Sequence, residues 1–410
     1  MSRAARYQPV DILYLWYLGG NRPELVGDLN LVLSARGVSL RYGKEWLRRG
    51  FALSEDLPLT DMEHLPREKD AAAGAVDDAR PDRWGERVIR LLEHPLRLSL
   101  MEMLHFAGDE RFGALGVSAS AESYLPRAPG PLPSLSDVEE LHAIVRRVLA
   151  GENIDERHRR LIAPGATMGG AQPKALLGID GASWVLKFAD EGGFAAPLAE
   201  HAAMTLASKA GIEAAETRPV RLAGGAAVAV RRFDRVAGKR LHALSANVAL
   251  KAAGAQLSYP ALAQLLRRRG ADEGGRNRLQ MRELFRRLIF NIFIDNTDDH
   301  EKNHVLLLTD SQHYLLAPAF DVLPTAQALG HQAMMVGADG TVSSVDNALS
   351  MFHAYGMNRQ EAVNEARGVA KVVEQWKPHF KAAGMDRAAI DSLAHWIDRP
   401  QLMEQRSGLK

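Results

Sequence analysis

The feature that most constrains the fold of this chain is an amphipathic segment in its C-terminal half. Apolar residues recur there at intervals of three and four, which is the spacing of one face of an α-helix. They are Met281, Leu284, Phe285, Leu288, Ile289, Ile292 and Phe293. The unbroken stripe predicts a helix buried in a hydrophobic core. This helix runs directly into eight polar residues, Asn296–Asn303, where a core helix would ordinarily end in a short turn.

Proline density sets the main boundary of the chain. Four prolines fall within the eight residues Pro126–Pro133, and proline at this density prevents both a helix and a central strand. The chain has 410 residues, more than the ~250–300 at which a single core stops growing. We therefore predict a first unit at 1–125 and a linker at 126–136.

Strand and helix patterns lie on both sides of this linker. Residues 10–60 mix short apolar runs with turn residues, which predicts a small strand-rich unit. After the linker, Ser136–Glu139 has the spacing of a capping box, so we expect a helix that reaches about Leu149. The runs Ala175–Ile179 and Ser183–Phe188 predict a hairpin, and helical patterns dominate the C-terminal part.

Composition excludes several classes of function. The chain carries 51 Lys and Arg against 50 Asp and Glu, a balance that argues against a dedicated nucleic-acid binder. It contains no cysteine, which excludes disulfides, thiolate metal ligands and a cysteine nucleophile. No window approaches ~20 uninterrupted apolar residues. Asp11 and Gly19 interrupt the N-terminal apolar run, which also lacks a cleavage signal. We expect a cytoplasmic protein with no membrane span.

The polar block after the core helix has the spacing of a phosphoryl-transfer site. In protein kinases the catalytic-loop Asp accepts the substrate hydroxyl proton, and an Asn five residues later binds a metal ion. Asp298 and Asn303 stand five apart, and Asp321 follows a predicted strand pair, where a kinase places its second metal-binding carboxylate. These oxygen groups suit magnesium. The alternative is a solvated loop that caps the helix.

A second set of candidates precedes this block. Gly165–Lys174 is small and glycine-rich enough to bring backbone N–H groups onto phosphate oxygens, although it is not a Walker A loop. Lys187 lies on the following predicted strand and matches the lysine that contacts nucleotide phosphates. Glu200, on the next predicted helix, is its candidate ion-pair partner. The alternatives are an exposed edge charge for Lys187 and a solvated helix residue for Glu200.

Two histidines, one within the polar block and one directly after it, allow a different interpretation. His300 and His304 are four residues apart, and with the nearby carboxylates they could suggest a metal site. No helix is expected there, so the spacing does not favour it. His300 is better explained as a residue that braces the catalytic loop.

Five segments carry a family resemblance in the order in which they occur. They are GATMGGAQPK (165–174), WVLKF (184–188), VRRFDR (230–235), NTDDHEKN (296–303) and PAFDV (318–322). Together they resemble the HipA family of bacterial toxin kinases. LRYGKEWLRRGFALSEDLPL (40–59) and DARPDRWGERVI (78–89) are similar to segments that this family carries ahead of its kinase core. The NTDDHEKN and GGAQPK blocks are the most specific.

The resemblance implies an α+β, two-lobed, protein-kinase-like fold with a small strand-rich N-terminal unit and a mostly helical C-terminal lobe. The domains would be a HipA-type N-terminal subdomain (1–125), the linker (126–136), a kinase N-lobe with the glycine-rich loop (137–258) and a helical C-lobe with the catalytic loop (259–410).

The resemblance also implies an activity and partners. The chain would be a Ser/Thr protein kinase that uses ATP and Mg²⁺ and acts as the toxin of a toxin–antitoxin pair. A HipB-like helix-turn-helix antitoxin would sequester it, and DNA would be contacted only through that antitoxin. The substrate would be a translation-related protein, such as an aminoacyl-tRNA synthetase or a translation factor.

Roles carry over by position. Asp298 would be the catalytic base, Asn303 and Asp321 would bind Mg²⁺, and Lys187 would bind the ATP phosphates. The other nucleotide-binding residues would be Gly169, Gly170, Ala171, Gln172, Lys174, Arg231, Phe233, His300 and Lys302, with Arg231 and Phe233 near the adenine. Thr167 stands where the best-studied members have a serine that the kinase phosphorylates in itself, and Arg231 replaces an acidic residue often found there.

Two other functions stay open. The chain could be a kinase of the same fold that acts on a small molecule or outside a toxin–antitoxin pair. It could also be an inactive binding module, but such a module has no reason to retain Asp298, Asn303, Asp321 and Lys187 together.

Overall fold

The computed structural model describes residues 8–127, 130–155, 158, 161–162, 172–189 and 196–409. Its contacts divide the chain into two units, Met1–Leu186 with Asp234–Leu244, and Lys187–Phe233 with Ser245–Lys410. Residues 137–186 therefore group with the N-terminal part, whereas the resemblance assigns them to the first kinase lobe. The boundaries implied by the resemblance stay predictions.

The first unit is built on a five-stranded antiparallel sheet with the order β4-β3-β2-β1-β5. Its strands are β1 (Ile12–Tyr17), β2 (Glu24–Val32), β3 (Gly37–Tyr42), β4 (Glu63–His64) and β5 (Leu115–Ser118). Leu13 and Leu15, two residues apart on β1, are both fully buried, as the period of a strand with one core face requires. The strand-rich unit predicted for residues 10–60 is present.

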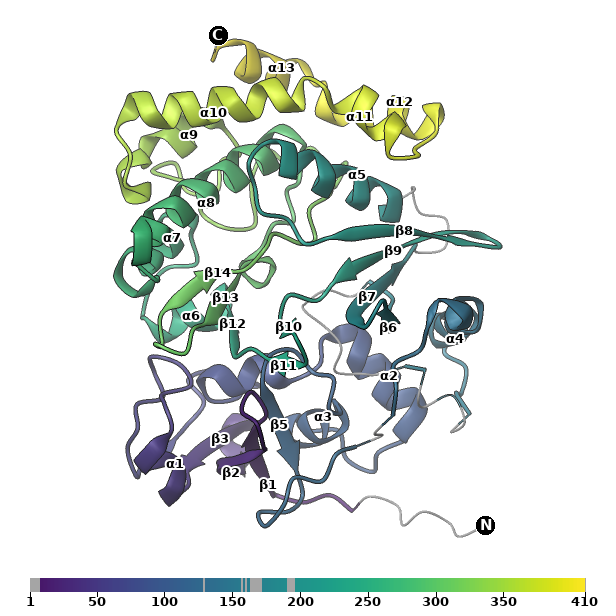
Figure 1. The fold of residues 1–410 in the computed structure, drawn as a ribbon, viewed down its shortest axis with the longest axis vertical. Helices are drawn as coiled ribbons and strands as arrows, with labels where there is room; N and C mark the ends of the chain where they lie inside the picture. The colour runs from purple at the N-terminus through teal and green to yellow at the C-terminus, as the bar shows by residue number, and fades with distance from the viewer. Residues whose placement is uncertain are drawn as a thin grey trace. The chain divides into compact units, whose positions relative to one another are not determined.

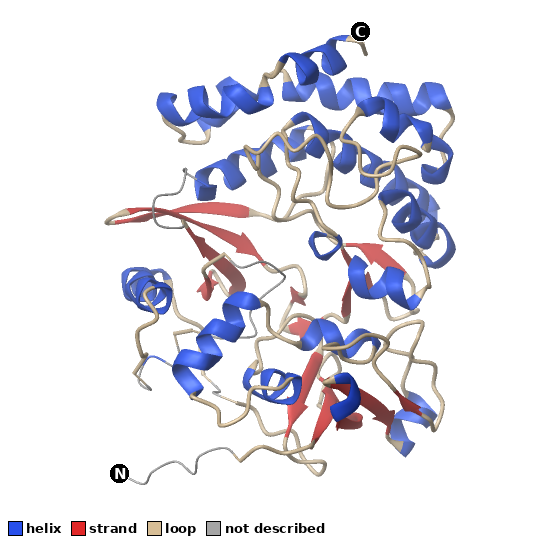
Figure 2. Cartoon of the chain, turned by 180° about the vertical axis from the view of Figure 1, so that it is seen from behind, coloured by secondary structure: helices blue, strands red, loops and turns tan. Residues whose placement is uncertain are grey.

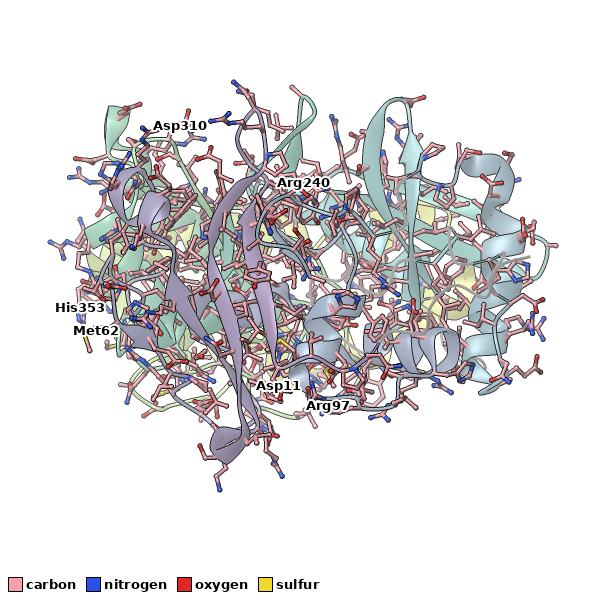
Figure 3. All side chains as sticks on the ribbon, turned by 90° about the horizontal axis from the view of Figure 1, so that it is seen from below. Asp11, Met62, Arg97, Arg240, Asp310 and His353 are labelled. Carbon is pink, nitrogen blue, oxygen red and sulfur yellow. The ribbon has the colours of Figure 1, made fainter. Side chains whose placement is uncertain are left out.

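The other elements of the first unit are short. They are α1 (Lys44–Arg49), α2 (Arg83–Glu93), α3 (Leu100–Phe106), α4 (Val138–Leu149), β6 (Lys174–Ile179), β7 (Ala182–Phe188), β10 (Arg235–Val236), β11 (Lys239–Arg240) and β12 (Ala243–Ser245), the last residues of β7 and β12 falling in the second unit. Glu102 closes a capping box with Ser99 at the start of α3. Arg97 binds both Glu102 and Asp11, which fixes the start of β1 to this helix (Figure 3).

Two local predictions around β6 and α4 can be compared with the structure. The hairpin of β6 and β7 is confirmed, and its turn residues Asp180 and Gly181 have φ values of 51° and 74°. These positive values are those of a two-residue type I′ turn, which matches the twist of the strands. The helix predicted to reach Leu149 does end there. The predicted position of the capping box, however, is wrong by two residues. The box is formed by Ser134 and Asp137, around a 3-10 turn that precedes α4.

The second unit is mostly helical (Figures 1 and 2). Its strands are β8 (Thr217–Leu222) and β9 (Gly225–Arg231), which form an antiparallel pair, and β13 (Val305–Leu308) and β14 (Tyr314–Leu316), which form another. Its helices are α5 (Ala196–Lys209), α6 (Ala246–Ala252), α7 (Tyr259–Arg269), α8 (Arg276–Phe293), α9 (Val345–Ser350), α10 (Arg359–Val373), α11 (Trp376–Ala382), α12 (Arg387–Ile397) and α13 (Pro400–Ser407).

Helix α8 is the core of the second unit, as its apolar stripe predicts. Every residue of the stripe is buried, and α8 packs between α7 and α10 (Figure 1). Arg282 and Arg286, on the other face of α8, pair with Glu361 and Glu365 of α10 at 2.5 and 3.0 Å. Because α8 is held on both faces, the loop that follows it begins from a fixed point.

In the part of the chain that the structure describes, no helix is long and apolar enough to cross a membrane.

Candidate active site

The polar block begins with a sharp turn at the end of α8. Asp295 adopts a left-handed conformation with φ 59°, which turns the chain out of the helix. A short 3-10 turn, Glu301–Asn303, then precedes β13, and the ring Nδ1 of His300 accepts a hydrogen bond from Lys302 N at 3.3 Å. His300 thus caps this turn, and its role in bracing a catalytic loop stays a prediction. Lys302 is half-buried in the same turn.

Asp298 and Asn303 lie together within this loop. The side-chain Nδ2 of Asn303 donates to the backbone oxygen of Asp298 at 3.3 Å. Asn303 is buried, and its Oδ1 has no hydrogen-bond partner among the described residues. The Asp298 side chain reaches solvent. Partial burial raises the pKa of its carboxyl, His300 opposes this shift, and the negative charges of Asp321 and Asp299 add to it.

Asp321 and Lys187 meet from distant parts of the sequence. The strand pair β13–β14 leads to Asp321, whose own backbone is left-handed with φ 58°. Lys187, on β7, places its Nζ 2.7 Å from Asp321 Oδ1 and 2.6 Å from Glu200 Oε1. Burial would lower the pKa of Lys187, but the two carboxylates raise it above its usual value, so the ammonium stays charged. The structure therefore brings together Lys187, Glu200 and Asp321.

A buried carboxylate beside Asp298 escaped the sequence analysis. Asp299 is 2% exposed, and its Oδ2 accepts hydrogen bonds from Asn291 Nδ2 at 2.8 Å and from the hydroxyl of Tyr259. His304 Nε2 lies 2.9 Å from the same oxygen. His304 is thus occupied by Asp299, and within the described residues no group of three His, Asp or Glu could hold a metal ion. The alternative of a histidine metal site has no support.

A second buried carboxylate anchors the start of the loop. Asp295 is 1% exposed and pairs with Arg399, at the start of α13, at 2.7 Å. Its Oδ2 also accepts from the backbone N of Ala328, and its backbone oxygen accepts from Thr325. The chain just after Asp321 is therefore tied to the chain just before Asp298. No sequence signal marks Asp295 for this role, since its partners lie 30 and more residues away.

The predicted adenine-side residues take different positions. Phe233 lies with its ring centre 5.5 Å from that of Phe320, the residue before Asp321. Arg231 is exposed at the end of β9 and pairs with Glu216 at 3.1 Å. Phe233 thus lies next to the site, while the guanidinium of Arg231 is held by a surface carboxylate.

The predicted phosphate loop is described only at its end. Thr167, Gly169, Gly170 and Ala171 lie outside the described residues. Gln172 is half-buried two residues before β6.

Lys174 is the first residue of β6 and belongs to the first unit. Its buried Nζ pairs with Asp82 at 2.9 Å, while its backbone oxygen accepts from Trp84 Nε1 at 2.8 Å. Asp82 and Trp84 belong to the DRWG segment, whose partner the sequence does not reveal. The ammonium of Lys174 is engaged by this ion pair.

Residues 166–376, about half of the chain, match the family described as HipA-like C-terminal domain. The chain belongs to the HipA family. Among solved structures, it is similar to HipA of Shewanella oneidensis MR-1 from a complex with HipB and its operator DNA. That likeness covers 97% of both chains at 16% identity with a TM-score of 0.68, and it shows that the whole chain has an α+β, kinase-like HipA fold.

The similarity to other known proteins is weaker or absent. A Helicobacter pylori proinflammatory kinase, CtkA, shows a weaker likeness, with a TM-score of 0.44 and 14% identity over 58% of this chain and 90% of that one. No curated protein matches the chain.

Proposed function

We propose that this member of the HipA family is a Ser/Thr protein kinase that uses ATP and Mg²⁺ and acts as a toxin. The observation that carries the proposal is the grouping of Lys187 with Glu200 and Asp321 in the same unit as the Asp298–Asn303 pair. Protein kinases use a lysine–glutamate pair of this kind. They also use two aspartates and an asparagine in the roles proposed here for Asp298, Asp321 and Asn303.

Two side chains fit a magnesium ion. Asn303 Oδ1 is a buried oxygen without a hydrogen-bond partner among the described residues, which is unusual unless a ligand completes it. Asp321 is a partly exposed carboxylate that pairs with Lys187, and Lys187 also pairs with Glu200. Both oxygen types suit Mg²⁺. When bound, Mg²⁺ would neutralise charge on the transferring phosphoryl group.

The chain's own residues supply the remaining chemistry. Asp298 would accept the proton of a substrate serine or threonine hydroxyl. The hydroxyl oxygen would form a bond to the γ-phosphorus of ATP while the bond from that phosphorus to ADP breaks. Its raised pKa suits this role, because a base is most effective with a pKa near the working pH. Lys187 would hold the phosphates, with Glu200 fixing the direction of its ammonium.

A HipB-like antitoxin is the proposed partner. The Shewanella protein of similar fold occurs with HipB and operator DNA. The net charge of +1 favours contact with DNA through such a partner over direct binding. A translation-related protein remains the proposed substrate.

The test is transfer of radiolabelled phosphate from ATP to proteins of a host lysate. We expect at least one labelled band with the wild type and Mg²⁺, and none with EDTA. Asp298→Asn should lower the rate by about 10²–10⁴-fold, the loss typical of a general base, and leave ATP binding intact. A wild type that labels no protein, nor itself, would refute the kinase function. Labelling of a small molecule alone would instead favour a small-molecule kinase.

A further inference from the structure

Asp298 and Asp299 are neighbours with opposite surroundings. Asp298 reaches solvent, whereas Asp299 is 2% exposed. A buried carboxylate is costly unless its oxygens are hydrogen-bonded. Asp299 meets this requirement with three polar partners on one oxygen: Tyr259, Asn291 and His304.

The three partners come from three elements of the second unit. Tyr259 begins α7, Asn291 lies near the end of α8, and His304 directly precedes β13. The rings of Tyr259 and His304 also contact each other edge to face, with centres 5.2 Å apart. Asp299 therefore ties the loop to two core helices and a strand at one point.

Asn291 extends this anchoring to the start of the loop. Its Oδ1 accepts from Asn296 Nδ2 at 3.1 Å, and its backbone oxygen accepts from Asn296 N at 2.9 Å. The loop is thus fixed at Asn296 and again at Asp299, on the two sides of Asp298. His304 fixes it once more immediately after Asn303.

We infer that Asp299 is a positioning residue of the proposed phosphoryl-transfer site: it fixes the backbone from which Asp298 and Asn303 project. This inference rests on the proposed function. Asp299 itself touches no reacting atom, because its carboxylate faces the core. Displacing a reacting group by 1 Å can lower a rate by about 10²-fold, so an anchor beside the base has a large effect on turnover.

The experiment compares Asp299→Asn and Tyr259→Phe with the wild type in phosphoryl transfer. Asn is nearly isosteric and removes the charge, whereas Phe removes one donor to Asp299 and leaves its charge. We expect kcat to fall by about 10–100-fold in Asp299→Asn, the usual cost of a residue that orients a metal or catalytic ligand, with KM for ATP within about twofold. Tyr259→Phe should show a smaller fall in kcat.

The outcomes separate this inference from the proposed function. An inactive wild type refutes the function. An active wild type with an unchanged kcat in Asp299→Asn overturns the positioning role. If Asp299→Asn does not fold, as judged by circular dichroism, Tyr259→Phe decides: a lowered kcat with unchanged KM supports the role, and a wild-type kcat overturns it.

Discussion

Lys187 and Asp321 are 134 residues apart in sequence, yet Nζ of the lysine lies 2.7 Å from Oδ1 of the aspartate. Glu200 holds the same ammonium from the other side at 2.6 Å. One positive and two negative charges therefore meet at this point, and Asp298 adds a further carboxylate nearby. Carboxylate oxygens are the ligands that Mg²⁺ prefers in proteins.

Removing Lys187 should destabilise the fold. Glu200 is fully buried, and Lys187→Met would deprive it of its cation. Breaking a buried ion pair from one side typically costs about 3–5 kcal/mol of the free energy of unfolding. Urea denaturation followed by circular dichroism measures this. The control is the double variant Lys187→Met/Glu200→Gln, which should regain most of the lost free energy of unfolding. Equal instability of the single and double variants would contradict a stabilising ion pair between Lys187 and Glu200.

Asp321→Ala should weaken nucleotide binding only when magnesium is present. The proposed role of this carboxylate is to bridge the metal, and binding without metal does not use it. Isothermal titration with a non-hydrolysable ATP analogue, with and without Mg²⁺, tests this. The exposed Asp310→Ala, in the β13–β14 turn, serves as the control. Identical affinities for Asp321→Ala and wild type under both conditions would rule out the metal role.

His300→Gln should move the acidic limb of the pH–rate profile to higher pH. In the proposed mechanism Asp298 acts as a carboxylate, so the rate should fall as pH drops through the pKa of Asp298. Partial burial already raises that pKa, and His300 counteracts the shift. Removing His300 should therefore raise the pKa further. His395→Gln on α12, an exposed histidine of the same unit, should leave the limb in place. A limb that moves downward in His300→Gln would contradict this electrostatic account.

Thr167 is the site at which self-phosphorylation is predicted. It is the only hydroxyl residue between Gly165 and Lys174, in the loop predicted to contact phosphate. A phosphate adds about −1.5 to −2 charge and would repel the ATP phosphates. Intact-mass spectrometry after incubation with ATP and Mg²⁺ should find the added phosphate on the wild type. Asp298→Asn and Thr167→Ala should lack it. No added mass on the wild type excludes self-inactivation through Thr167.

Local patterns predicted the elements of this fold well. The stripe of α8 and the Asp180-Gly181 hairpin depend on the periodicity of nearby residues, which the sequence displays directly. The candidate pair of Lys187 and Glu200 is also close in sequence, only 13 residues apart. The structure brings that pair together, and its nucleotide-binding role stays a prediction.

Long-range partners could not be predicted in the same way. Two adjacent aspartates look alike in a sequence, and only the packing of α7 and α8 distinguishes the buried Asp299 from the solvent-facing Asp298. The partner of Lys174 is Asp82, 92 residues earlier, and no periodicity connects the two. The predicted role of Lys174 in nucleotide binding stays a prediction.

The left-handed backbone of Asp321 has a consequence for stability that is opposed to the proposed role of its side chain. Its φ of 58° is a conformation that glycine adopts without strain and that other residues adopt at a cost. Glycine at this position would also leave Lys187 with a single balancing carboxylate, Glu200. Asp321→Gly should thus be more resistant to unfolding than Asp321→Ala, because both lose the carboxylate and only glycine adopts this φ without strain. A lower thermal midpoint for Asp321→Gly than for Asp321→Ala would contradict this. The backbone at position 321 therefore favours glycine, and the aspartate is held there at a cost in stability.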